Sequence, residues 1–186
     1  MQKLKILGAD VYLENFEFGK GKIIITNGYD NYSYGWGAMG STLEDFILSI
    51  NSSYFINAVC PHSLMSVFDA KRTATAIRKR IAEFLPYWKH MPFQKEMRLE
   101  IKKVEECSSQ NDFEYWARNF ESNLPFYEID CRFDRQDLES EFEGLMCEWW
   151  YMMETKDSPQ VLFLARLFKE LQRELKKQSK LKAIAA

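Results

Sequence analysis

The segment Phe18-Gly19-Lys20-Gly21-Lys22-Ile23-Ile24-Ile25-Thr26-Asn27-Gly28 decides the fold of this chain. Its first two glycines predict a tight turn, because glycine adopts the positive φ angles that hairpin turns need. Residues 23–26 are β-branched throughout, which is the composition of a buried strand. Asn27-Gly28 then opens a second turn. A strand with a turn at each end predicts antiparallel pairing on both sides.

The flanking segments supply the two neighbouring strands. Before the first turn, Val11, Leu13 and Phe16 are separated by polar or aromatic residues in a largely alternating pattern. After the second turn, Tyr32-Ser33-Tyr34-Gly35-Trp36-Gly37 alternates large side chains with small ones. The sequence therefore predicts a three-stranded antiparallel meander within residues 9–37.

Helical patterns follow the predicted sheet. Ser41 and Glu44 form an S-x-x-E capping box, which predicts that Ser41 begins the first helix. Apolar residues recur at helical spacing in three later segments, which are residues 69–85, 92–104 and about 111–121.

The C-terminal part has the most regular pattern. Asp134 precedes one apolar stripe, which consists of Leu138, Phe142, Leu145, Trp149 and Met152. Ser158-Pro159 has the residue types of a helix start, and it precedes a second stripe of Val161, Leu164, Phe168, Leu171 and Leu175. Two such stripes joined by a short loop predict an antiparallel helical hairpin. Apolar residues off the stripes, Trp150 and Tyr151 among them, must bury against the rest of the domain or against a second subunit in a homodimer.

Together these patterns predict an α+β fold in one domain, residues 1–186. The domain would hold a sheet with a capped helix (1–60), a helical middle (61–133) and the helical hairpin (134–182). Apolar residues make up 46% of the chain and aromatic residues 15%, which is enough for a sizeable core.

Composition also bounds the location of the protein. No apolar run approaches the roughly 18 residues that span a bilayer, and the first residues alternate where a signal peptide would be continuously apolar. The four cysteines, Cys60, Cys107, Cys131 and Cys147, form no C-x-x-C pair. Reduced, mostly buried thiols and a cytoplasmic location are expected.

The net charge of −2 hides strong segregation along the chain. Residues 71–104 hold ten basic against three acidic side chains, residues 105–157 hold four against fifteen, and residues 158–186 hold seven against two. Such blocks can pair with one another inside the fold, or they can present faces of a single sign to partners.

Motifs for catalysis and for cofactor binding are missing from the sequence. It contains no P-loop, no G-x-G-x-x-G, no G-x-S-x-G and no H-E-x-x-H. The one Cys/His neighbour pair is in Cys60-Pro61-His62, and no further residue has the spacing of a zinc ligand. We therefore expect no enzyme activity, no metal and no cofactor.

An acidic run in the C-terminal half is one candidate for a partner-binding surface. It consists of Glu128, Asp130, Asp134, Asp137, Glu139, Glu141 and Glu143. The simplest interpretation is the solvated face of a helix. Alternatively, a row of carboxylates imitates a phosphate backbone and occupies a nucleic-acid-binding groove on a partner. In a third interpretation, Glu128, Asp130 and Asp134 bind Mg²⁺ in a nuclease.

An aromatic row is the alternative candidate, for nucleic acid. Tyr32, Tyr34 and Trp36 point the same way from one strand and could stack on single-stranded bases, with Arg78, Lys79 and Arg80 contacting phosphate. A sheet face buried under helices explains the same row without a ligand. A second basic helix face consists of Lys169, Arg173, Lys176, Lys177, Lys180 and Lys182. Because the sequence pI is near 5.8, internal pairing with the acidic block is the simpler expectation for both basic faces.

Part of the N-terminal segment resembles a known group of proteins. The residues are Phe18-Gly19-Lys20-Gly21-Lys22-Ile23, Tyr32-Ser33-Tyr34-Gly35-Trp36-Gly37-Ala38-Met39-Gly40 and Glu44-Asp45-Phe46. They are similar to small uncharacterised proteins of bacteriophages and prophages, in which a glycine-bearing hairpin leads into a W-G-x-M-G turn and a helix. The resemblance covers about residues 11–60 and implies a phage origin. By analogy, it also implies a protein that binds and blocks a host protein, as anti-CRISPR inhibitors do.

The sequence thus predicts a non-enzymatic interaction protein that acts in the host cytoplasm. Its predicted target is a host protein that handles nucleic acid, with a CRISPR or other defence nuclease as the specific candidate. A single-stranded nucleic-acid-binding accessory protein and a metal-dependent nuclease are the two alternatives.

Overall fold

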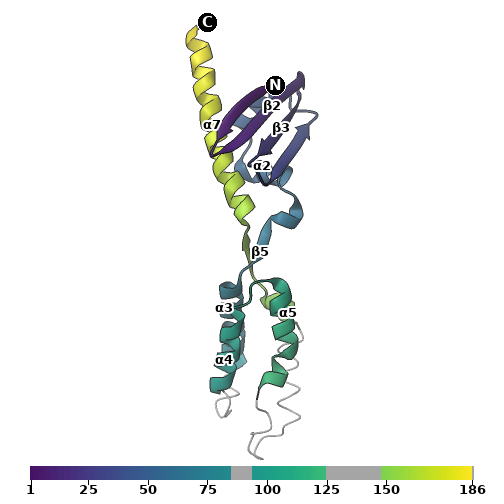
Figure 1. Cartoon of the computed structure of the whole chain (residues 1–186), viewed down its shortest axis with the longest axis vertical. Coiled ribbons are helices and arrows are strands. Elements are labelled where there is room, and N and C mark those ends of the chain that lie inside the picture. The colour runs from purple at the N-terminus through teal and green to yellow at the C-terminus, as the bar shows by residue number, and fades with distance from the viewer. Residues whose placement is uncertain (85–93, 125–147, 186) are drawn as a thin grey trace, which may run out of the picture. The chain divides into compact units, whose positions relative to one another are not determined.

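The computed structural model describes residues 1–84, 94–124 and 148–185. In it the chain forms two compact units. Unit 1 combines Met1–Ser66 with Asp157–Ala186, and unit 2 is Val67–Lys156. Both ends of the chain belong to unit 1 (Figure 1). The division into one domain of three consecutive segments stays a prediction.

Unit 1 is built on a four-stranded antiparallel sheet. Its strands, in spatial and in chain order, are β1 (Gln2–Ile6), β2 (Ala9–Glu17), β3 (Lys20–Thr26) and β4 (Asn31–Trp36). The prediction of three strands was therefore wrong by one. The strand that it missed, β1, pairs with β2 through a turn in which Leu7 and Gly8 both have positive φ angles.

The glycines of the deciding segment have different tasks. Gly19 and Gly28 have φ angles of +79° and +90°, so both predicted turns need glycine. Gly21 instead lies within β3, where an added Cβ atom would stand 2.8 Å from the backbone oxygen of Glu14. This close approach is next to the irregularity in pairing between Asn15 and Glu17.

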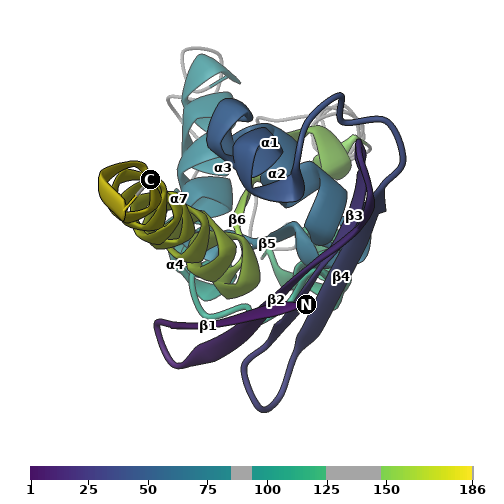
Figure 2. The same ribbon diagram turned by 90° about the horizontal axis from the view of Figure 1, so that it is seen from above.

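Three helices, α1 (Leu43–Ser49), α2 (Ser52–Val59) and α7 (Pro159–Ala185), cover one face of the sheet (Figure 2). The core between them contains side chains that alternate along the strands, such as Val11 with Leu13 and Ile23 with Ile25. Phe55 of α2 stacks on Phe168 of α7, with ring centroids 4.5 Å apart.

The first helix begins one residue later than predicted. Its N-cap is Thr42, whose side chain accepts a hydrogen bond from the Asp45 N–H and donates one to the Asp45 carboxylate at 2.7 Å. Asn15 explains the shift, because its side chain reaches across from β2 and accepts a hydrogen bond from the Leu43 N–H at 2.8 Å.

Helix α7 begins at Pro159, as Ser158-Pro159 predicts. The Val161 N–H donates to the Ser158 hydroxyl oxygen, and this hydroxyl donates to the backbone oxygen of Leu64. The apolar stripe of α7 packs into the core of unit 1. The predicted hairpin differs from this arrangement, because Trp149 and Met152 of the first stripe belong to the core of unit 2. The rest of that stripe lies outside the described residues.

Unit 2 has a core of its own. Its helical elements are α3 (Ala70–Phe84), α4 (Gln94–Val104), α5 (Gln110–Asn119) and the short 3₁₀ helices η2 (Glu121–Asn123) and η4 (Trp149–Met152). Helices α3 and α4 contribute Ile77, Ile81, Met97 and Ile101 to this core, in agreement with their predicted apolar faces. The indole N–H of Trp116 on α5 donates to the backbone oxygen of Glu100 at 3.1 Å, so the largest side chain in this core has a polar partner.

A two-stranded ribbon marks the two places where the chain passes between the units. It consists of β5 (Ser66–Phe68) and β6 (Thr155–Asp157), and the short 3₁₀ helix η1 (His62–Leu64) precedes it. Backbone hydrogen bonds from Ser158 to Met65 and from Asp69 to Glu154 flank the ribbon. The first and last residues of unit 2 therefore lie on paired strands.

Candidate partner-binding surface

The acidic run predicted to bind a partner, residues 128–143, lies outside the described residues. Its members Glu128, Asp130, Asp134, Asp137, Glu139, Glu141 and Glu143 keep their status as a sequence-based prediction.

The predicted aromatic row lies mainly in the core of unit 1. Tyr32 and Trp36 are only 3% and 7% exposed, whereas Tyr34 between them is 40% exposed. Trp36 contacts Tyr34 edge-on at 5.0 Å between ring centroids and packs against Phe46 of α1 at 5.5 Å. Stacking on successive bases requires successive exposed rings, and this row offers one.

Two polar atoms of the row are buried without a hydrogen-bond partner among the described residues. They are the hydroxyl group of Tyr32 and the indole Nε1 of Trp36. Burial, together with the nearby carboxylate of Asp30, raises the pKa of Tyr32 to about 12. The phenol is therefore held in its neutral form, as expected of a core residue.

The basic residues assigned to the same nucleic-acid site belong to unit 2. Arg78, Lys79 and Arg80 are exposed on α3. The Arg78 guanidinium donates to Glu105 at 2.5 Å and holds the pKa of that carboxyl group below its ordinary value. Arg80 forms an ion pair with Glu83 at 3.4 Å. Lys79 forms no ion pair with any residue that the structure describes.

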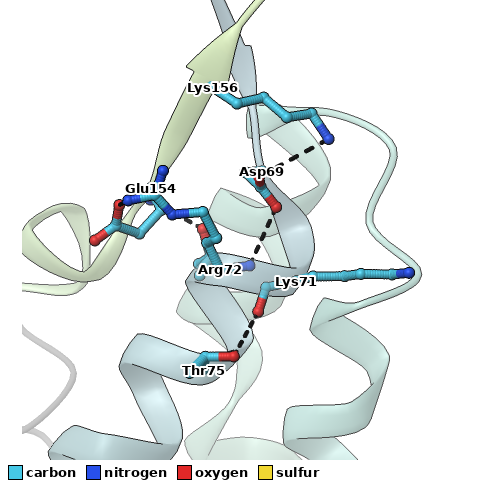
Figure 3. Close-up of polar contacts among 7 residues, drawn as sticks. Asp69, Lys71, Arg72, Thr75, Glu154 and Lys156 are labelled. Carbon is cyan, nitrogen blue, oxygen red and sulfur yellow. Dashed lines mark hydrogen bonds and ion pairs between the residues drawn. The ribbon is translucent and has the colours of Figure 1, made fainter.

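A polar cluster at the start of α3 fixes the chain that follows η4 (Figure 3). Asp69 accepts a hydrogen bond from the Arg72 N–H at 3.1 Å and lies 3.9 Å from the Lys156 amine of β6. Arg72 in turn forms an ion pair with Glu154 at 2.9 Å. The N–H of Glu154 donates to the buried hydroxyl oxygen of Thr73 at 2.9 Å. These contacts hold the segment after η4 against α3.

Helix η4 itself is anchored through its first aromatic side chain. Trp149 contacts Phe113 edge-on at 5.6 Å, and Phe113 is fully buried in the core of unit 2. The next two aromatic residues leave the core, because Trp150 is 49% exposed and Tyr151 is 76% exposed. Their ring centroids lie 6.0 Å apart. Helix η4 therefore exposes two large rings to solvent, directly after a third ring, Trp149, that packs against the core of unit 2.

A groove of about 410 Å³ lies beside the exposed rings. Its lining residues are Ala76, Lys79, Arg80, Glu83, Glu148, Tyr151, Met152 and Glu154. We call this groove, together with Trp150, the η4 surface. It carries both signs of charge, and neither Lys79 nor Glu148 forms an ion pair with a described residue. In the sequence, Trp150 and Tyr151 are recognisable only as apolar residues off the stripe.

Two thiols, those of Cys60 and Cys107, belong to the described part of the chain. Cys60 is buried, and burial raises the pKa of its thiol. Cys107 is half-buried, and its pKa is raised by burial and by the nearby Asp112. Among the described residues, no three His, Cys, Asp or Glu side chains stand close enough together to hold a metal ion.

Within the described ranges, no helix has the length and apolar character needed to cross a membrane. No curated protein and no solved structure matches the chain. One family model matches residues 1–177, far more than the segment that resembles phage proteins. The chain therefore belongs to the phage family Phage_phiTE_072.

Proposed function

We propose that this chain is a non-enzymatic phage protein that binds and inhibits a host protein in the host cytoplasm. The target class that we propose is proteins that handle nucleic acid, with a CRISPR or other defence nuclease as the specific candidate. Membership of a phage family supports this proposal, because a phage product without its own chemistry acts through the machinery that it binds.

The exposed pair of Trp150 and Tyr151 is the observation that carries the proposal. Tryptophan, tyrosine and arginine are the residues that dominate binding energy at protein interfaces. Each aromatic side chain can bury on the order of 150–250 Å² against a partner. Because Trp149 packs against the core of unit 2 and contacts the Trp150 ring, ordering the pair on binding costs little conformational entropy.

The charges of the η4 surface favour a protein as the partner. Glu83, Glu148 and Glu154 line the same groove as Lys79 and Arg80. Glu83 is paired with Arg80 and Glu154 with Arg72, so the groove offers no uniformly basic surface to a polyanion. A protein surface, in contrast, can present complementary charges of both signs. We further propose that the acidic run at 128–143 contacts the target separately, as a carboxylate row that competes for a groove where the target binds phosphate.

The first experiment is capture of host proteins by tagged protein after nuclease treatment, followed by affinity measurement with the purified target. We expect the double variant Trp150→Ala/Tyr151→Ala to weaken binding at least 100-fold, because two hot-spot side chains cost about 2 kcal/mol or more each. Tyr115→Ala is the matched control. Its ring is exposed on α5 of the same unit but does not line the groove, so affinity should be unchanged.

Three outcomes would remove the proposal. The first is a target that binds the double variant as tightly as the wild type. The second is a homodimer that the double variant dissociates, since the rings would then face a second copy of this chain. The third is divalent-ion-dependent cleavage of nucleic acid by the protein alone, which would favour the nuclease alternative.

A further inference from the structure

Helix α7 carries a row of basic side chains on the side opposite its buried stripe. The row consists of Arg166, Lys169, Arg173, Lys176, Lys177 and Lys180, and all six residues are exposed. Their spacing of three and four residues keeps them on one face of the helix. From Arg166 to Lys180 the face extends about 21 Å, at a rise of about 1.5 Å per residue. We call it the α7 basic face.

Most of this charge is not neutralised within the described residues. Arg173 pairs with Glu170, and Lys177 pairs with Glu174 at 2.6 Å. Both pairs lie within the helix and are exposed, so they contribute little and can exchange partners. The other four, Arg166, Lys169, Lys176 and Lys180, form no ion pair with a described residue. Pairing of this face with the acidic run at 128–143 stays a sequence-based prediction, because that run lies outside the described residues.

The face is also rigid. The opposite side of α7 is held in the core of unit 1 by Leu164, Phe168 and Leu171, all of them buried. The side chain of Gln172 donates two hydrogen bonds, to the backbone oxygens of Ile47 and Ile50. Past these contacts, the C-terminal end of α7 extends beyond the strands of the sheet (Figure 1). The cations thus stand in a line that folding has already fixed.

This arrangement fits two anionic partners poorly. A helix that lies in a membrane surface inserts its apolar face among the lipids. The apolar face of α7 is already occupied by the core of unit 1, so membrane insertion would require unit 1 to open. Single-stranded nucleic acid is bound by basic grooves that also carry aromatic rings for base stacking. The α7 basic face contains no aromatic residue.

We propose that the α7 basic face binds the phosphate backbone of double-stranded DNA. A duplex carries a regular line of negative charge along each strand, which a straight line of cations on a rigid helix complements. Contacts of this kind position a protein on DNA without reading its sequence. The inference does not depend on the η4 surface, which belongs to unit 2.

The test is fluorescence anisotropy of a labelled 20-base-pair duplex with the full chain, between 50 and 200 mM salt. Four unpaired cations predict a slope of log affinity against log salt of about −3.6, or about a 150-fold loss over this range. The triple variant Lys169→Gln/Lys176→Gln/Lys180→Gln should bind at least 10-fold more weakly at 50 mM salt and show a slope near −1. A duplex of unrelated sequence should bind equally well.

A control with the same change in net charge is available in unit 2. Lys71, Lys95 and Lys102 are exposed and form no ion pair with a described residue. The variant Lys71→Gln/Lys95→Gln/Lys102→Gln should keep the wild-type affinity and slope. Circular dichroism should show unchanged helix content and melting temperature for both triple variants, because all six side chains are exposed.

Several results would overturn the inference. These are duplex binding that is absent or independent of salt, an equal loss in both triple variants, and binding to anionic vesicles but not to duplex. Failure here is separable from failure of the proposed function. The Trp150→Ala/Tyr151→Ala variant should bind duplex like the wild type, and the α7 triple variant should still bind the host protein.

Discussion

At the scale of single residues, Tyr32 shows how a core position constrains its chemistry. Its ring fills the space between the sheet and the helices of unit 1, but its hydroxyl group has no hydrogen-bond partner among the described residues. A buried polar group without a partner costs stability. The raised pKa, about 12, adds a dependence on pH. Between pH 10 and pH 12 the unfolded phenol ionises and the folded one does not, so the stability of the fold falls as pH rises through this window.

Tyr32→Phe therefore has two expected effects. At pH 7 the free energy of unfolding should stay the same or rise by up to about 1 kcal/mol, because no hydrogen bond is lost. Above pH 10 the wild type should lose up to about 3 kcal/mol that the variant retains, since two pKa units are worth about that much. Urea unfolding from pH 7 to pH 12, followed by circular dichroism, measures both. A variant less stable than the wild type at pH 7 would mean that the hydroxyl group does have a partner.

Residue-level patterns predicted those features that depend on local chemistry. The turns at Gly19 and Gly28 and the helix start at Ser158-Pro159 all follow from one or two residue types. The start of α1 was predicted one residue early, because the deciding contact comes from Asn15, 28 positions before Leu43. Sequence spacing cannot show a hydrogen bond that depends on tertiary contact.

At the scale of elements, one buried hydroxyl group helps to hold the segment that follows η4 against α3. The Glu154 N–H donates to Thr73, which is fully buried on α3. Thr73→Val keeps the shape of the side chain and removes the acceptor, so we expect a loss of about 1–3 kcal/mol. Thr75→Val on the same helix is the control. Its hydroxyl donates only to the backbone oxygen of Lys71 on an exposed face, and its cost should stay within about 0.5 kcal/mol.

Thermal unfolding of both variants, with tryptophan fluorescence as the probe, measures this difference. Equal melting temperatures for Thr73→Val and Thr75→Val would mean that the hydrogen bond to Glu154 does not hold η4. In that case the rigidity argued for Trp150 and Tyr151 would rest on Trp149 alone.

Helix α7 shows what an apolar pattern can and cannot predict about packing. The stripe from Val161 to Leu175 was predicted correctly as a buried face. Its packing partner was not, because periodicity reports that a face is buried and not what buries it. The second helix of a hairpin and the face of a sheet can each bury the same apolar stripe. The choice between them depends on contacts between residues more than 100 positions apart, such as Gln2 with Gln178.

At the scale of the whole molecule, the two cores should respond separately to damage. Leu164 is fully buried in unit 1, so Leu164→Ala should cost about 2–5 kcal/mol. We expect faster hydrogen exchange in the sheet, α1, α2 and α7, with amides of α3, α4 and α5 still protected. Hydrogen-exchange mass spectrometry of the intact chain resolves these peptides. A matching loss of protection in both units would show that the two cores unfold as one.

The ribbon of β5 and β6 contains both points at which the chain passes between unit 1 and unit 2. Residues that enter and leave unit 2 stand on paired strands, so the intervening segment is attached to unit 1 like a loop between two adjacent strands. A segment joined in this way can be exchanged for another of different length without altering the fold that carries it. Recombination between phages can therefore replace unit 2 as a cassette while unit 1 is inherited unchanged.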